Sequence, residues 1–129
     1  MGICIHSKNF PIEMDMGYGT FFNMRMDICY HLGIFKKEDE SLNIRYSYDK
    51  EIYKALRKKK ITKGTYNFLL APDAEHKLSP DSCRGLLSDI SDLTSPYMYG
   101  YIWTKYNRFE DFRQILRHCI RERKYLIWR

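Results

Sequence analysis

The sequence lacks the motifs by which many nucleotide-dependent and hydrolytic enzymes are recognised. It has no G-x-x-x-x-G-K-[ST] phosphate-binding loop and no G-x-S-x-G nucleophile elbow. The G-x-G at Gly17–Gly19 misses the third small residue of a dinucleotide fingerprint, because Phe22 stands there. His76 lies among acids and serines, but a polar loop before a capped helix explains this cluster better than a hydrolytic site. We therefore expect a protein that is not an enzyme and has no catalytic residues.

Metal-binding and disulfide patterns are also missing. The cysteines are few and far apart, and no two histidines have the spacing of metal ligands. No run is long and apolar enough to span a membrane, and no secretory signal is visible. These absences predict no metal, no cofactor and no membrane partner. They also predict reduced thiols in a cytoplasm.

The composition is that of a globular chain with excess positive charge. With 129 residues and 44% hydrophobic content, residues 1–129 are expected to form a single compact domain. The net charge is +6, and eight basic residues fall between Lys105 and Arg129. This favours phosphate-bearing or acidic partners, although a solvated surface is the alternative. Aromatic residues make up 16%, so an aromatic interface in a homo-oligomer would be unsurprising.

Hydrophobic spacing and helix-start residues predict a mostly helical α+β fold. Helices are expected over Thr20–Leu32 before Gly33, from Asp49 to about Lys60, from Thr62 to Pro72, from Ser79 to Ser95, and after Asn107. The basic run Arg57–Lys60 is interpreted as a solvated helix end that the helix dipole favours. Strands are expected at both ends of the chain, in Gly2–His6 and Tyr125–Trp128, and their pairing would form a small sheet.

The stretch Gly17-Tyr18-Gly19-Thr20 is the first candidate binding site. We expect a tight turn at the glycines, with Thr20 capping the helix that follows. Free N–H groups at a helix start attract anions. The predicted ligand-binding residues of this site are Lys8, Asn9, Gly17, Tyr18, Gly19, Thr20 and Arg25. The alternative is a purely structural turn, with Arg25 paired to Asp15.

The second candidate lies near the end of the chain. In an extended segment Tyr97 and Tyr99 would share one face with Tyr101 and Trp103, as a platform for stacking a base. A stripe of arginines at every fourth position follows, in Arg113, Arg117 and Arg121. Arginines beside aromatics suit nucleotides, nucleic acids and protein interfaces alike. A buried aromatic strand beside a solvated helix is the alternative.

Both ends of the chain carry a recognisable set of residues. The opening has Ser7-Lys8-Asn9, Asp15-Met16-Gly17-Tyr18-Gly19, Phe21-Phe22 and Arg25, and the ending has Phe109, Asp111-Phe112, Leu116, Cys119 and Trp128. With these residues the chain resembles a group of short phage and prophage proteins of Gram-positive bacteria. The chain departs from this pattern at Thr20, where glycine is expected. The resemblance implies a mobile-element origin and a place in the host bacterial cytoplasm.

Three hypotheses about function follow. Small phage proteins without an active site frequently counter host defence, so we expect a non-enzymatic inhibitor that sequesters a phosphate-bearing nucleotide immune signal. The alternative is an inhibitor that binds a host defence protein, such as a nuclease or effector, directly. A further alternative is nucleic-acid binding through the C-terminal arginines.

Overall fold

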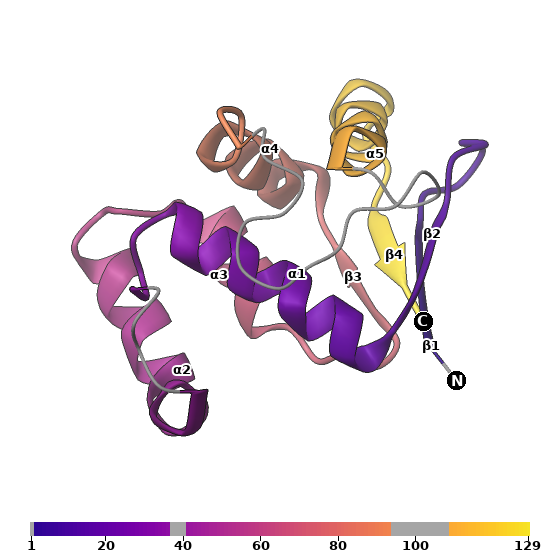
Figure 1. Ribbon diagram of the computed structural model, residues 1–129. Helices are drawn as coiled ribbons and strands as arrows, with labels where there is room; N and C mark the ends of the chain where they lie inside the picture. Colours follow the sequence, from indigo (N-terminus) through magenta and orange to yellow (C-terminus); the bar gives the residue numbers. More distant parts are fainter. Residues whose placement is uncertain (1, 37–40, 94–108) are drawn as a thin grey trace.

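The computed structural model describes residues 2–36, 41–93 and 109–129, with the main chain alone for 41–46. The described part has an α+β fold of five helices and four strands (Figure 1), as the sequence predicts. In chain order the elements are β1 (Gly2–His6), β2 (Met14–Gly17), α1 (Tyr18–His31), α2 (Ser41–Arg57), α3 (Lys63–Leu70), β3 (His76–Leu78), α4 (Pro80–Asp89), α5 (Phe109–Glu122) and β4 (Leu126–Trp128).

The four strands form one antiparallel sheet in the order β2-β1-β4-β3. The terminal strands pair as expected, with Ile5 opposite Trp128. The strands β2 and β3 were not predicted. In β2 the alternation of buried Met14 and Met16 with exposed Asp15 covers only four residues, too few for a clear strand pattern.

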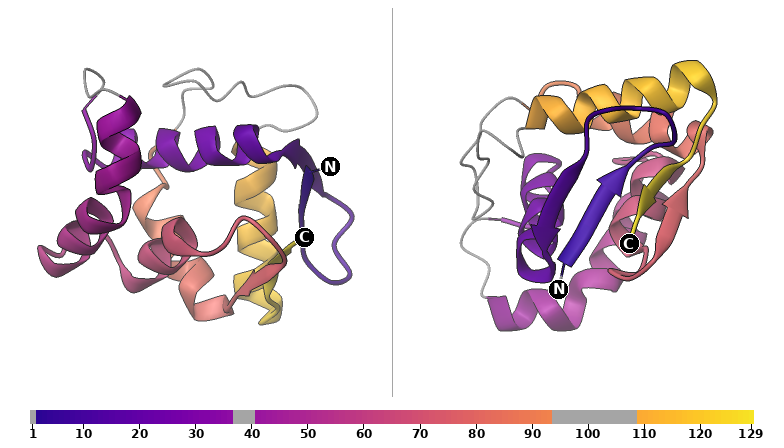
Figure 2. Two further views of the ribbon diagram at one scale, coloured as in Figure 1. Left: turned by 90° about the horizontal axis from the view of Figure 1, so that it is seen from below. Right: turned by 90° about the vertical axis from the view of Figure 1, so that its right-hand side faces the viewer.

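One face of the sheet packs against the helices, and no described helix covers the other face (Figure 2, right). Ile3, Ile5 and Leu126 project from the inner face into the core and are buried. The centre of the core is aromatic: the ring of Trp128 lies 6.0 Å from Phe21 and 5.6 Å from Phe68. Many of the phenylalanines and tyrosines thus serve packing rather than a surface function.

The helix α1 differs from its prediction at the start. It begins at Tyr18 with Gly17 as its N-cap, so Thr20 lies inside the first turn and does not cap the helix. Its end was predicted correctly: Gly33 follows with φ of 74°, a left-handed conformation that glycine adopts readily. The apolar stripe of Phe21, Met24 and Ile28 is buried as expected.

The helix α2 starts earlier than expected. It begins at Ser41, so Asp49 lies in the middle of the helix instead of capping it. After Arg57 the chain leaves the helix through Lys59, whose φ is 59°. The N–H of Lys60 then bonds the carbonyl of Ala55 at 2.9 Å, the closing bond of a Schellman motif. Figures 1 and 2 place α2 at the end of the molecule away from the sheet.

The helices α3 and α4 start as predicted and pack closely together. The Thr62 side chain caps α3 and the Ser79 side chain caps α4. The approach is tight at Gly64, where an added Cβ would lie 2.1 Å from the Ser82 carbonyl oxygen. One carboxylate oxygen of Asp89, at the end of α4, accepts from the Thr62 N–H at 2.8 Å and the Thr65 hydroxyl at 2.5 Å.

Candidate functional site

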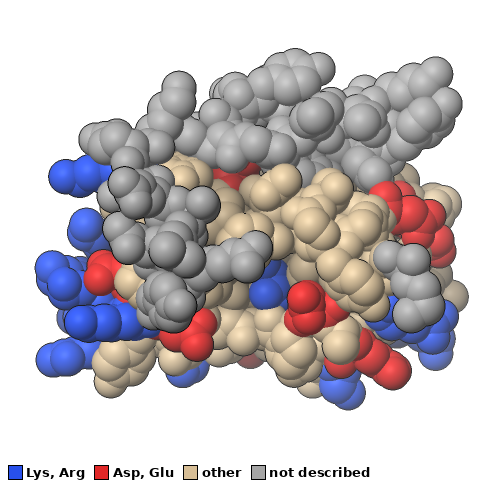
Figure 3. Space-filling view, turned by 60° about the horizontal axis from the view of Figure 1, so that its bottom comes forward, with Lys and Arg blue, Asp and Glu red and all other residues tan. Residues whose placement is uncertain are grey.

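Basic side chains crowd the outer side of α2 and the start of α3. We call this surface the α2–α3 basic face. It consists of Lys50, Lys54, Arg57, Lys58, Lys59, Lys60 and Lys63, with the tyrosines Tyr53 and Tyr66 among them. All seven cationic residues are exposed, and Glu51 is the one acid between positions 50 and 63. Figure 3 shows Lys and Arg side chains gathered at the edge of the molecule where Figure 1 places α2.

The charges on this face repel one another. Lys50 and Lys54 project from the same side of α2, and Lys58, which directly follows the helix and bonds the carbonyl of Lys54, continues the same spacing of four. Each like-charged pair at this spacing destabilises a helix by about 0.2–0.5 kcal/mol. None of the seven cations forms an ion pair with a residue in the described part of the chain. A bound anion would therefore relieve a repulsion that no ion pair with a described residue compensates.

Two aromatic rings lie within this basic face. Tyr53 is 52% exposed, and its ring centroid lies 5.9 Å from the Arg57 guanidinium and 6.5 Å from the Tyr66 ring. The Lys63 ammonium lies 4.7 Å from the Tyr66 ring. A surface pocket of about 420 Å³ is bordered by Lys50, Tyr53, Lys54, Arg57 and Lys58. Cations beside a ring suit a ligand with phosphates and a planar base.

The inner side of α2 holds this face in place. Ile52 and Ala55 are buried, at 0% and 4% exposure. The Tyr48 hydroxyl donates a 2.9 Å hydrogen bond to the Leu69 carbonyl at the end of α3. The basic side chains thus project from a helix that is packed into the core.

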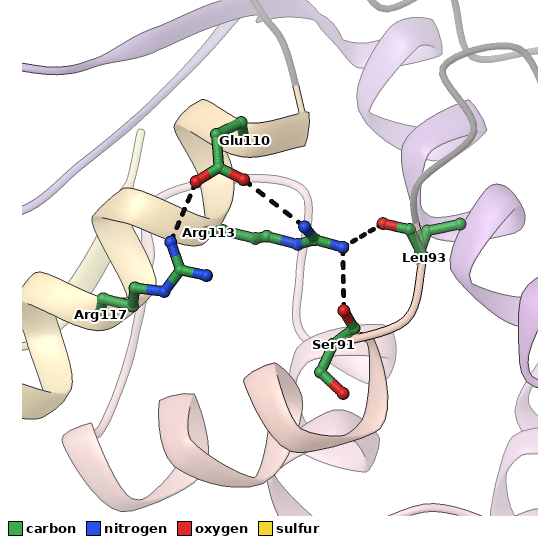
Figure 4. A network of polar contacts seen from close by, with 5 residues as sticks. All are labelled: Ser91, Leu93, Glu110, Arg113 and Arg117. Atoms are coloured by element: carbon green, nitrogen blue, oxygen red, sulfur yellow. Dashed lines mark hydrogen bonds and ion pairs between the residues drawn. The ribbon is translucent and has the colours of Figure 1, made fainter.

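Three arginines of α5 (Arg113, Arg117 and Arg121) contact acids or carbonyls of the protein instead. Glu110 accepts from Arg113 at 3.5 Å and from Arg117 at 3.0 Å (Figure 4). Arg113 also donates to the carbonyls of Ser91, at 3.0 Å, and Leu93. Arg121 lies 3.4 Å from Glu122. The stripe predicted as a nucleic-acid surface is therefore largely paired with acids or holds α5 to the end of α4.

The glycines of Gly17-Tyr18-Gly19-Thr20 do not form the expected turn. Gly17 has φ of −72° and ψ of 166°, and neither glycine has a positive φ. A strand simply runs into a helix here. An added Cβ at either glycine would have no atom within 4 Å, so neither is needed for a close approach. The prediction of a tight glycine turn is wrong.

Lys8 and Asn9 lie far from this helix start. They belong to the loop between β1 and β2, whereas Gly17 pairs with Gly2 at the other end of the same two strands (Figure 1). Asn9 has φ of 65°, and the Lys8 carbonyl accepts a 3.1 Å hydrogen bond from Nε2 of His118. The structure therefore does not bring Lys8, Asn9 and the N–H groups after Gly19 together around one anion.

Arg25 points into the interior and is 7% exposed. Its guanidinium donates to the carbonyls of Leu69 at 3.4 Å, Ala71 at 2.7 Å and Pro72 at 3.4 Å. It also lies 4.2 Å from the centroid of the Phe21 ring. Burial lowers the pKa of the guanidinium from its ordinary value. Arg25 thus satisfies carbonyls at the end of α3, which have no partner within that helix.

A pocket of about 250 Å³ lies beside Arg25, but acids border it. Asp49 and Asp73 line it together with Phe22, Tyr48 and Arg25. Two carboxylates make it unfavourable for a phosphate. The remaining predicted ligand residues, Tyr97 and Tyr99, lie outside the described residues.

Two kinds of group could take part in chemistry in the described part of the chain: clusters of metal-binding side chains and cysteine thiols. There, no three or more His, Cys, Asp or Glu side chains are grouped to hold a metal ion. Burial raises the pKa of Cys29 to about 12, and burial beside Asp15 and Glu13 raises that of Cys4 to about 12. Both side chains are therefore protonated thiols at neutral pH, which are poor nucleophiles.

The spacing of the lysines in the sequence already carries a signal for the α2–α3 basic face. The i, i+4 repeat of Lys50, Lys54 and Lys58 indicates one side of a helix. The prediction of a helix capped by Asp49, however, makes the run Arg57–Lys60 a solvated helix end alone. No described helix is long and apolar enough to cross a membrane.

The chain was compared with protein-family models, curated proteins and solved structures. No family model, curated protein or solved structure matches it.

Proposed function

We propose that this protein is a non-enzymatic binding protein for a phosphate-bearing nucleotide ligand, held on the α2–α3 basic face. The observation that carries the proposal is the set of seven exposed cations without an ion-pair partner in the described residues, arranged around Tyr53 and Tyr66. Cations bind the phosphates, and exposed rings accept bases. This places the ligand site on residues other than those expected from the glycine stretch.

A protein that binds a nucleotide without converting it can act by sequestration, because binding lowers the concentration of the free nucleotide. The resemblance to short phage proteins supports a role as an inhibitor of bacterial immunity that captures a nucleotide immune signal. Direct binding of a host defence protein is the second candidate. It is favoured by Tyr18 and Phe22, which are 43% and 39% exposed one turn apart on α1.

Calorimetric titration with nucleotide second messengers and short oligonucleotides tests the proposal. The double variant Lys54→Gln/Arg57→Gln should lose at least tenfold in affinity, because two phosphate contacts are removed. The matched control is Arg117→Gln/Arg121→Gln, which removes the same charge from α5 and should change affinity less than twofold. No binding by any of these ligands, or an equal loss in both variants, would refute the proposal. Capture of a host nuclease or effector without nucleotide binding would favour the second candidate.

A further inference from the structure

We infer that the ligand of the α2–α3 basic face is a single strand of nucleic acid. The inference rests on the proposed function and names the class of ligand. It follows from the length over which the cations extend and from the position of Tyr53 among them.

The cations extend further than the phosphates of one nucleotide. Lys50 lies on α2 and Lys58, eight residues later, directly follows its end and still bonds the carbonyl of Lys54, so the two stand about 12 Å apart along the helix axis. Lys59, Lys60 and Lys63 continue the positive surface around the end of α2 to the start of α3. A nucleic-acid strand in a duplex carries one phosphate per roughly 3.4 Å, so 12 Å corresponds to about four phosphates. A free nucleotide presents its phosphates at one point and would leave part of this face unpaired.

The position of Tyr53 selects a single strand over a duplex. Its half-exposed ring lies between Lys50 and Arg57 on the same side of α2, and the Tyr66 ring lies 6.5 Å away at 59°. A base stacks on such a ring only when it is not enclosed in a duplex. Stacking on an aromatic side chain contributes roughly 5- to 150-fold in affinity per base. A duplex would meet the lysines with its phosphates but would gain nothing from Tyr53.

The test compares probes that differ in length and strandedness. Fluorescence anisotropy would follow oligothymidylates of 2, 4, 8 and 12 nucleotides, a 12-base-pair duplex and inorganic polyphosphate. Affinity should rise steeply to the length that fills the face and only slowly beyond it. For about four phosphates, the slope of log K against log salt concentration for a single strand should be about −3.

Tyrosine variants separate stacking from charge. Tyr53→Ala should weaken the 12-nucleotide strand at least fivefold and leave the duplex and polyphosphate within twofold. The matched control is Tyr125→Ala: Tyr125 is 44% exposed with the Lys77 ammonium 4.8 Å from its ring, the same kind of pair outside the basic face. This control should change none of the affinities. Because both rings are exposed, circular dichroism should show both variants folded.

The outcomes distinguish the inference from the proposed function. If the duplex binds as tightly as the single strand, if Tyr53→Ala has no effect, or if a free nucleotide binds more tightly than the 12-nucleotide strand, the inference is refuted. The proposed function would survive these results if Lys54→Gln/Arg57→Gln still loses binding of a nucleotide ligand. If no nucleotide or nucleic acid binds, both fail.

Discussion

The guanidinium of Arg25 donates a 2.7 Å hydrogen bond to the main-chain carbonyl of Ala71, 46 residues further along the chain. The Trp128 indole N–H and the Tyr48 hydroxyl reach neighbouring carbonyls, those of Pro72 and Leu69, both at 2.9 Å. Side chains from α1, α2 and β4 therefore converge on the end of α3. This joins both ends of the chain to its middle, and it gives a structural role to Arg25, which the sequence analysis includes among the candidate ligand residues.

Replacing Arg25 by methionine should destabilise the protein by about 1–3 kcal/mol. The variant keeps a long apolar side chain but removes the donor of the Ala71 carbonyl, whereas the carbonyls of Leu69 and Pro72 keep their bonds from Tyr48 and Trp128. Urea denaturation measures the free energy of unfolding. The control is Arg84→Met, on the exposed surface of α4, which should stay within about 0.5 kcal/mol of the wild type. Equal stability of the two variants would contradict this role for Arg25.

Two glycines should respond to alanine in opposite directions. Gly64→Ala places a methyl group where the Ser82 carbonyl oxygen lies, so α3 and α4 must separate, at a cost of about 1–3 kcal/mol or more. Gly19→Ala lies in the first turn of α1 with no neighbour within 4 Å and should stabilise by up to about 1 kcal/mol. Thermal and urea denaturation of both variants measure this. If Gly19→Ala instead lowered the stability of the protein, this result would support a turn that requires glycine at this position.

Lys59→Gly should stabilise the protein by roughly 1 kcal/mol. Lys59 adopts φ of 59° after the end of α2, a left-handed conformation that is unfavourable for a residue with a Cβ. The control is Lys60→Gly, which removes the same charge where the φ is not positive and should bring no such gain. Denaturation at equal salt concentration compares the two. A larger gain in Lys60→Gly would point to relief of charge repulsion as the cause.

Asp89→Ala should cost about 2–3 kcal/mol, because the N–H and hydroxyl of Thr62 and the hydroxyl of Thr65 lose their shared acceptor. Asp89→Asn keeps one carbonyl oxygen for these donors and should lose less. Urea denaturation of both variants ranks the effects. Equal losses would show that the negative charge, and not the oxygen as acceptor, holds α3 and α4 together.

Short-range sequence patterns predicted much of the fold. The caps at Thr62 and Ser79, the stop at Gly33 and the apolar stripe of α1 depend on neighbours within a few residues, and the structure has them as expected. The start of α2 and the strands β2 and β3 were missed. A strand of three or four residues is too short to show a clear alternation of buried and exposed side chains. Whether such a strand forms therefore depends on the neighbouring strands with which it pairs.

The candidate site was harder to predict than the fold. Which charged side chains stay available for a ligand depends on contacts with groups that are far away in the sequence. Arg113 and Arg25 were both candidates for contact with a ligand, yet the folded chain places carbonyl groups within their reach. The run Arg57–Lys60 was expected to be a solvated helix end. Its side chains are exposed, and no described acid lies within ion-pair distance of them, which is why they enter the proposed site.

By itself, the sequence determined the class of this protein: an α+β chain with a positive net charge, several well-marked helix starts and terminal strands that pair. Only the tertiary structure decided which cations remain free for a ligand. An arginine is neutralised or buried by whatever group the fold brings to it, and for Arg25, Arg113 and Arg117 that group lies 3 to 46 residues away. No described residue forms an ion pair with the cations of the α2–α3 basic face, and for this reason the proposed ligand site lies there.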